Sequence, residues 1–271
     1  MPPLKLPTPA TDHLAAQPVY PPSEDSFLLL DAFSLPSSTA FFADRFPPSS
    51  TPSPLLVEIG SGSGIVSAFL AAHALPIFSR RDILTLALDV SLTANSVTHT
   101  TVTTTAAEHP DTAATFLDTV TSDLASCLRP RTVDILVFNP PYVPTEAAPS
   151  LDILRGGSSG GSDGDTSTST NTHRQRVLVD PQGAEDRAME EYLLSLTYAG
   201  GEKGMQTTDR LLDGLHDVLS EQGVLYLLLC AGNRPAEVVQ RVEALPAGWR
   251  MELVIERRAG WEILSIWRIY R

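Results

Sequence analysis

The feature that most constrains this chain is a repeated pattern in which a short apolar run precedes a helix-length segment. The runs at 55–59 and 133–138 have the length and composition of strands buried on both faces, and 83–88 repeats the pattern. A weaker run lies at 114–120. Strands separated by helix-length segments indicate βαβ units, in which a mostly parallel sheet carries helices on both faces. The sequence therefore predicts an α/β fold.

The remaining elements follow from the same kinds of pattern. Ser23 is a candidate N-cap for a helix over 26–33, with acidic residues in its first turn. A second helix is expected from 94, ending in the threonine-rich stretch 98–105. The other predicted elements are helices at 65–74, 207–219 and 235–244, a strand at 224–230, and an antiparallel hairpin of strands at 251–257 and 262–269.

Length and composition favour one decorated domain over 1–271. A chain of 271 residues with 42% hydrophobic residues can bury one sizeable core. Residues 1–19 form a proline-rich tail with little pattern. The segment 145–185 is rich in glycine, serine, threonine and aspartate, too polar to bury much surface, and we expect it to be a flexible insertion.

Charge and cysteine content narrow the classes of function. The net charge of −13 disfavours nucleic acid as a partner, because phosphate binding depends on lysine and arginine. Cys127 and Cys230 lie far apart, beside or inside apolar runs, as expected of buried thiols in a reducing compartment. The six histidines are scattered and no apolar stretch has the length of a membrane span. We therefore expect a soluble cytoplasmic or nuclear protein without a metal site.

Two polar features follow the first two strands, where an open parallel sheet binds its ligands. The loop Gly60–Gly64 comes shortly after Glu58. Its glycines Gly60, Gly62 and Gly64 would let a ligand approach the backbone at a helix N-terminus. A tight turn without a ligand could also require these glycines. This loop lacks the Gly-x-Gly-x-x-Gly spacing of dinucleotide sites. Asp89 ends the second strand, and its spacing from the glycine loop is typical of ribose recognition. This position fits a site for NAD or for S-adenosylmethionine equally. Asp89 could instead be the N-cap of the next helix.

Two further features follow the third and fourth strands. Asp123, before Leu124, could accept a hydrogen bond from an adenine amino group or lie in solvent. Asn139-Pro140-Pro141-Tyr142 decides among the alternatives, because an amide nitrogen is a poor nucleophile that an enzyme must hold and orient. The Asn139 side-chain oxygen and the Pro140 backbone oxygen can each accept one N–H, and Tyr142 can pack on a planar substrate group. The sequence thus predicts methyl transfer to a nitrogen.

The chain resembles the HemK-like glutamine methyltransferases, in the eukaryotic and archaeal branch that methylates the class-I translation termination factor. The resemblance spans nearly the whole chain apart from its polar insertions. It rests on the segments 20–32, 57–64, 122–124, 138–143, 199–204, 209–210 and 259–265.

The resemblance implies a Rossmann-like class I methyltransferase fold with a seven-stranded sheet and S-adenosylmethionine as the cofactor. Ser26, Glu58, Gly60 and Asp89 would hold the amino-acid and ribose parts of this cofactor. Asp123 and Leu124 would meet the adenine, and Asn139 would grip the substrate glutamine. The family also implies a heterodimer with a small zinc-binding activator protein, which adds a strand to the sheet edge. The predicted strand at 114–120 would offer that edge.

The chain departs from the family in its insertion of about forty polar residues after Tyr142 and in its threonine-rich stretch, both of which we expect to be tolerated surface loops. The substrate would be the termination factor, alone or with its GTP-binding partner. Two alternatives remain. The same motif could grip the amino group of adenine in DNA or RNA, although the acidic charge argues against this. A non-catalytic scaffold subunit would not need Asp89, Asp123 and Asn139 at strand ends.

Overall fold

A single seven-stranded sheet forms the centre of the protein in the computed structural model, which describes residues 2–17, 19–151 and 181–271. The strands are β1 (Leu55–Ile59), β2 (Leu84–Asp89), β3 (Thr115–Thr121), β4 (Val133–Phe138), β5 (Leu219–Cys230), β6 (Arg250–Ala259) and β7 (Glu262–Tyr270). Their order is β3-β2-β1-β4-β5-β7-β6, and only β7 runs antiparallel to its neighbours β5 and β6. The predicted α/β fold with a C-terminal antiparallel hairpin is confirmed.

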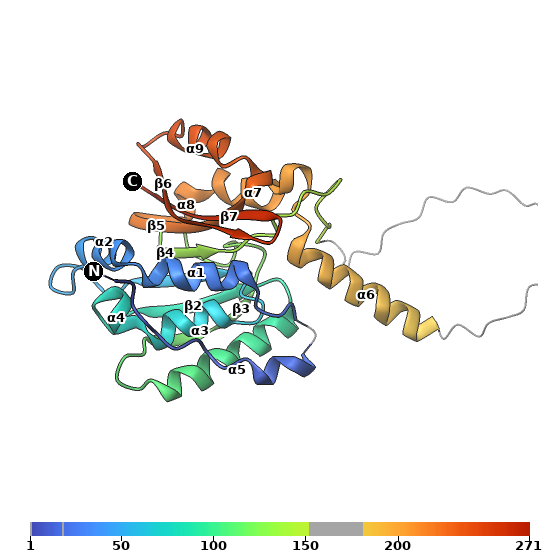
Figure 1. Cartoon of the computed structure of the whole chain (residues 1–271), viewed down its shortest axis with the longest axis horizontal. Coiled ribbons are helices and arrows are strands. Elements are labelled where there is room, and N and C mark those ends of the chain that lie inside the picture. Colours follow the sequence, from blue (N-terminus) through green and yellow to red (C-terminus); the bar gives the residue numbers. More distant parts are fainter. Residues whose placement is uncertain (1, 18, 152–180) are drawn as a thin grey trace, which may run out of the picture.

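Helices cover both faces of this sheet (Figure 1). The group α1 to α5 lies on one side, and α7 to α9 lie on the other. The α-helices are α1 (Glu24–Ser34), α2 (Pro36–Arg45), α3 (Ile65–Ala72), α4 (Ala74–Phe78), α5 (Leu92–Glu108), α6 (Pro181–Tyr198), α7 (Gln206–Asp213), α8 (Leu215–Val218) and α9 (Pro235–Glu243), and the short 3-10 turns are Asp12–Ala16, Glu202–Gly204 and Ala231–Asn233. The expected helix over 207–219 is split at Gly214 into α7 and α8.

Alternating side chains along the central strands build two cores. Leu56, Ile135 and Tyr226 are fully buried on the face of α1 to α4, where Tyr226 stacks on Phe33 at 4.4 Å between ring centroids. Val57 and Leu136 are buried in the opposite core. Because both faces are covered, β1 and β4 are apolar at every position except Glu58 and Asp134. Asp134 accepts the N–H of Leu55 at 2.9 Å and the hydroxyl of Ser220 at 2.6 Å, whereas Glu58 lies at the cavity described below.

The threonine-rich stretch is wrongly predicted as the end of a helix and as a tolerated loop, because α5 continues through it to Glu108. Thr98, Thr101 and Thr105 are buried at helical spacing on one face. The hydroxyls of Thr101 and Thr105 donate to the carbonyl oxygens four residues earlier, at 3.0 and 2.8 Å. These bonds satisfy the hydroxyls inside the helix, so the low helix propensity of threonine is outweighed by packing.

The segment predicted as an insertion, 145–185, falls largely outside the described residues. Within the described part, α6 begins at Pro181 and was not predicted. Its apolar residues Met189, Tyr192, Leu193 and Leu196 follow the i, i+3, i+4, i+7 spacing of an amphipathic helix, which the polar composition before them obscured. Figure 1 shows α6 projecting from the body of the molecule beyond the end of the sheet.

Two further expectations concern surface and burial. Cys230 is buried as expected, but Cys127 is exposed, because the turn after β3 that carries it lies on the surface. In the described part of the chain, no single helix is long and apolar enough to cross a membrane; only α1 and α2 taken together reach that length and hydropathy, across a 60° bend.

Candidate active site

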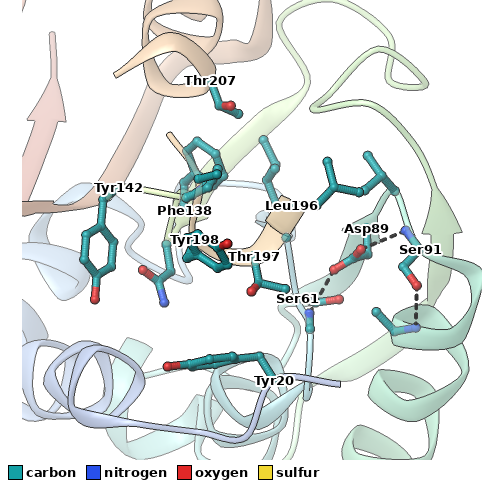
Figure 2. Close-up of a pocket in the computed structure, with 18 of the residues that line it drawn as sticks. Tyr20, Ser61, Asp89, Ser91, Phe138, Tyr142, Leu196, Thr197, Tyr198 and Thr207 are labelled. Atoms are coloured by element: carbon teal, nitrogen blue, oxygen red, sulfur yellow. Dashed lines mark hydrogen bonds between the residues drawn. The ribbon is translucent and has the colours of Figure 1, made fainter. Parts of the chain in front are cut away.

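A cavity of about 1140 Å³ lies at the carboxyl ends of the parallel strands, which is the edge predicted for ligand binding. The residues predicted from the sequence that line it are Ser26, Glu58, Gly60, Gly62, Asp89, Asp123, Leu124, Asn139, Pro141 and Tyr142. Gly64 and Pro140 do not line it. In Figure 2, Asp89 and Ser61 lie on one side of the cavity, and Tyr20 and Tyr142 lie on the other.

The glycine loop and Asp89 form one hydrogen-bonded unit. Gly60 and Gly62 have φ of +67° and +53°, a conformation that favours glycine. The Asp89 carboxylate accepts the N–H of Gly62 at 3.0 Å and the N–H of Ser91 at 2.9 Å (Figure 2). Burial raises the pKa of Asp89, opposed by these backbone donors. Asp89 therefore holds the loop in place at the strand end, and Ser91, rather than Asp89, is the N-cap of α5.

Gly64 has a packing role. It is the N-cap of α3 with φ of +76°, and a Cβ added there would lie 2.7 Å from the Cα of Thr98 in α5. Thr98 in turn donates its hydroxyl to Ser61 Oγ at 3.0 Å. The close approach of α3 and α5 therefore requires a glycine, and this contact positions the loop that lines the cavity.

Glu58 is a buried carboxyl group within the central strand β1. Its side chain, on a residue only 2% exposed, accepts a hydrogen bond from Ser67. Burial raises the pKa of Glu58 to about 8, with the Ser67 hydrogen bond acting in the opposite direction. A cationic group in the cavity would favour the ionised form, which fits the predicted contact with a ligand that carries an amino group.

This raised pKa predicts a dependence of stability on pH. An unfolded chain ionises Glu58 near pH 4.5 while the folded protein keeps the proton up to about pH 8, so the unfolded state binds fewer protons between these values. The free energy of unfolding should therefore fall as pH rises through this window, by up to about 1.4 kcal/mol per pH unit from this group. Urea unfolding at several pH values should show a smaller slope for Glu58→Gln. The same change at exposed Glu108 is the control, and equal slopes for both variants would contradict the assignment.

Asn139 follows β4 directly, and its side-chain amide is held at one end only. Its Nδ2 donates to Asp25 Oδ2 at 3.1 Å. The Oδ1 atom is buried and has no hydrogen-bond partner among the residues that the structure describes. An unsatisfied buried acceptor is unfavourable, so a ligand N–H in the cavity would relieve a cost of about 1 to 3 kcal/mol. A residue that lines the cavity therefore carries a buried acceptor without a partner in the described part of the chain.

The backbone after Asn139 is held from behind by Asn233 and by a glycine-rich turn. Asn233 is buried; its Nδ2 donates to the carbonyl oxygens of Tyr142 and Lys203, both at 2.9 Å, and its Oδ1 accepts the N–H of Cys230. Pro140 is buried and lies outside the cavity lining, so its role as a second acceptor stays a prediction. Burial, and next the Asp25 carboxylate, raise the pKa of Tyr142, which keeps its phenol neutral.

Gly204 should tolerate no side chain. It has φ of +67°, and a Cβ added there would lie 1.9 Å from the Tyr142 carbonyl oxygen. Gly248 is a matched control, since it has φ of +72° and nothing within 4 Å of an added Cβ. We expect Gly204→Ala to lose about 1 to 3 kcal/mol more stability than Gly248→Ala in urea unfolding, because only the first variant adds overpacking to backbone strain. Equal losses of stability would show that the turn containing Gly204 shifts to accept a side chain without cost.

Asp123 is part of an ion pair at the far end of the cavity. Arg210 of α7, which also lines the cavity, donates to its carboxylate at 2.8 Å. Leu124 has φ of +49°, a strained conformation for a leucine that turns the chain sharply after β3. Both residues therefore line the predicted adenine end of the cavity, and their contact with an adenine stays a prediction.

Several residues at the site were not predicted from the sequence. Asp25 was interpreted only as an acidic residue in the first turn of α1, and no local pattern could reveal its contact with Asn139, 114 residues away. The C-terminal part of α6 supplies another wall of the cavity, with Leu193, Leu196 and Tyr198 among its lining residues. A parallel bridge between Val143 and Ala199 joins this wall to the segment after Tyr142.

Comparison with known proteins identifies relatives along nearly the full length of the chain. No model of a known protein family matches it. The "eRF1 methyltransferase catalytic subunit mtq2" of Schizosaccharomyces pombe is 30% identical over 269 residues, covering 98% of this chain and 96% of that protein. The "Methyltransferase HEMK2" of Homo sapiens is 29% identical over 261 residues, covering 92% of this chain and 87% of that protein.

A solved structure supports the same fold. It is the E. cuniculi Mtq2-Trm112 complex, described as responsible for methylation of the eRF1 translation termination factor. Its matching chain is 20% identical, with a TM-score of 0.51, and the match covers 94% of this chain and 99% of that one. The similarity in fold thus extends over most of both chains.

Proposed function

This chain belongs to the HemK-like family of eRF1 methyltransferases, and from this premise we propose that it transfers a methyl group to the side-chain amide of a glutamine in a translation termination factor. The observation that carries the proposal is the buried Asn139 Oδ1, which lacks a hydrogen-bond partner in the described part of the chain and belongs to a residue lining the cavity. A primary amide has two N–H groups, and one of them would satisfy this acceptor.

The cofactor of the proposed reaction is S-adenosylmethionine, whose sulfonium carries an electrophilic methyl group. The described residues fit it in three respects. Asp89 ends β2 where ribose hydroxyls would lie, the glycine loop leaves backbone space, and the Glu58 carboxyl can meet an amino group. The cavity volume of about 1140 Å³ leaves room for a substrate side chain beside the cofactor.

Positioning is the contribution of the chain's own residues. The amide nitrogen of glutamine has a delocalised lone pair and attacks poorly. A hydrogen bond to Asn139 Oδ1 fixes one N–H, so the nitrogen faces the cofactor side of the cavity instead of rotating freely. Holding reactants in an attack geometry can contribute about 7 to 11 kcal/mol in favourable cases. Tyr142 is neutral and partly buried, and it can cover the planar amide from one side.

We also propose that a small zinc-binding activator protein pairs with the edge strand β3. This strand ends the sheet order, and Leu117 on it is 49% exposed. The described E. cuniculi structure is a complex with Trm112, which supports a partner of this kind. Strand addition would pair the free edge and cover apolar surface. The zinc would belong to the partner. We further propose that the protein is located in the cytoplasm or the nucleus.

The test uses the protein together with its activator and labelled S-adenosylmethionine. Separate reactions contain the termination factor, alone or with its GTP-binding partner, and DNA or RNA. We expect label in the termination factor, on a glutamine located by peptide mass spectrometry. Label in nucleic acid alone would support an adenine amino-group methyltransferase. If the protein binds the activator but no substrate becomes labelled, the result would support a scaffold subunit.

A further inference from the structure

The two carboxylate oxygens of Asp25 accept hydrogen bonds from different parts of the chain. It lies in the first turn of α1 and is 8% exposed. Its Oδ1 accepts three hydrogen bonds, from Ser23 Oγ at 2.8 Å, from the Ser26 N–H at 2.6 Å and from Ser26 Oγ at 3.2 Å. Its Oδ2 accepts the Nδ2 of Asn139 at 3.1 Å. One oxygen therefore organises the start of α1, and the other reaches the residue after β4.

A carboxylate in this place determines which way the Asn139 amide faces. Asparagine presents a donor at one end and an acceptor at the other, and an ionised carboxylate can only accept. Rotating the Asn139 amide by 180° would set Oδ1 against Asp25 Oδ2, two acceptors in contact. The observed orientation is thus the favourable one, and it leaves Oδ1 as the end without a partner in the described residues.

We propose that Asp25 is a positioning residue that holds the Asn139 amide with its oxygen toward the substrate nitrogen. This inference rests on the proposed function. Asp25 also lines the cavity, but both of its oxygens already accept hydrogen bonds from the protein, so its proposed action is through Asn139. The hydrogen bond to a carboxylate also polarises the amide, which increases the negative charge on Oδ1 and strengthens its hold on a substrate N–H as that nitrogen becomes positive.

The sharpest test is Asp25→Asn, which keeps size and shape. The three donors around Oδ1 require an oxygen there, so the new NH2 group must face the Nδ2 of Asn139. That places two donors in contact and drives the Asn139 amide to rotate, presenting its NH2 to the substrate. We expect kcat to fall by about 100- to 1000-fold, with KM for the termination factor and Kd for the cofactor changed less than about threefold.

A second substitution should rescue the first. In Asn139→Asp alone, two carboxylates would face each other, and activity should also fall. In D25N/N139D the amide and the carboxylate exchange places, so one oxygen at position 139 accepts from position 25 and the other faces the cavity. We expect the double variant to exceed D25N in kcat by at least about tenfold, as coupled neighbours do. Asp31→Asn is the matched control, because Asp31 lies on the same helix and pairs with Arg257 at the surface.

Two outcomes would overturn the inference: wild-type kcat in D25N, or a double variant no faster than D25N. A measurement that does not depend on methyl transfer separates this inference from the proposed function. The side-chain NH2 signals of Asn139 in 15N NMR, assigned with Asn139→Ala, should exchange slowly in the wild type and change in D25N. Unchanged signals would reject the role of Asp25, whereas absence of methyl transfer by the wild-type protein would reject only the proposed reaction.

Discussion

Replacing Asn139 by alanine should reduce kcat by about 100- to 1000-fold, comparable with removal of one hydrogen-bonding group from a preorganised catalytic site. The variant loses the only side-chain atom at the end of β4 that is both buried and unsatisfied in the described part of the chain. Glutamine could still enter the cavity, but its amide would rotate freely. The loss should appear in single-turnover methyl transfer to the termination factor.

Cofactor binding provides the control for this prediction. The Asn139 side chain hydrogen-bonds Asp25 rather than the glycine loop or Asp89, so calorimetry should give a Kd for S-adenosylmethionine within about threefold of the wild type. Asn95→Ala is a useful comparison, because Asn95 is a buried asparagine outside the cavity lining that bonds the Asp89 carbonyl oxygen and Thr121. Full turnover in Asn139→Ala would refute the proposed grip on the substrate nitrogen.

Replacing Asp89 by asparagine should weaken the cofactor rather than slow the chemistry. Asp89 accepts from the Gly62 and Ser91 backbones at the same time, and an asparagine has one acceptor atom and one donor group for these two N–H groups. The loop would lose a charged hydrogen bond worth about 1.5 to 3 kcal/mol, and an acceptor for ribose hydroxyls would be lost as well. We expect Kd for S-adenosylmethionine to rise by about 10- to 100-fold.

The matched control for Asp89 is Asp44→Asn on α2, an exposed residue at which the same chemical change is made outside the cavity lining. Its Kd should equal that of the wild type. At saturating cofactor, Asp89→Asn should recover most of its turnover, which distinguishes it from Asn139→Ala. If calorimetry gave Asp89→Asn an unaltered Kd, the glycine loop and β2 end would not be the cofactor site.

The local sequence pattern was sufficient to predict an element wherever its residues favour only one kind of structure. Mostly apolar runs produce the buried strands β1 and β4, with the same bounds that were predicted. The carboxyl ends of β1, β2 and β4 placed Glu58, Asp89 and Asn139 at one edge of a parallel sheet, because successive βαβ units bring all carboxyl ends together. The closing hairpin β6-β7 was equally clear from its short connection.

Long-range contacts decided the rest. The threonines of α5 remain helical because they pack on α3 and hydrogen-bond the glycine loop, which no window of sequence contains. Helix α6 forms a wall of the cavity although polar residues precede it.

The sequence by itself determined the sheet and the set of polar groups at its edge, because burial periodicity is a local property of the chain. Only the tertiary structure decided which end of the Asn139 amide is bonded and which is left without a partner in the described part of the chain. That choice depends on Asp25, which is distant in sequence and accepts one end of the amide at 3.1 Å. A hydrogen bond has direction, and its direction is set by whichever partner folding brings within reach.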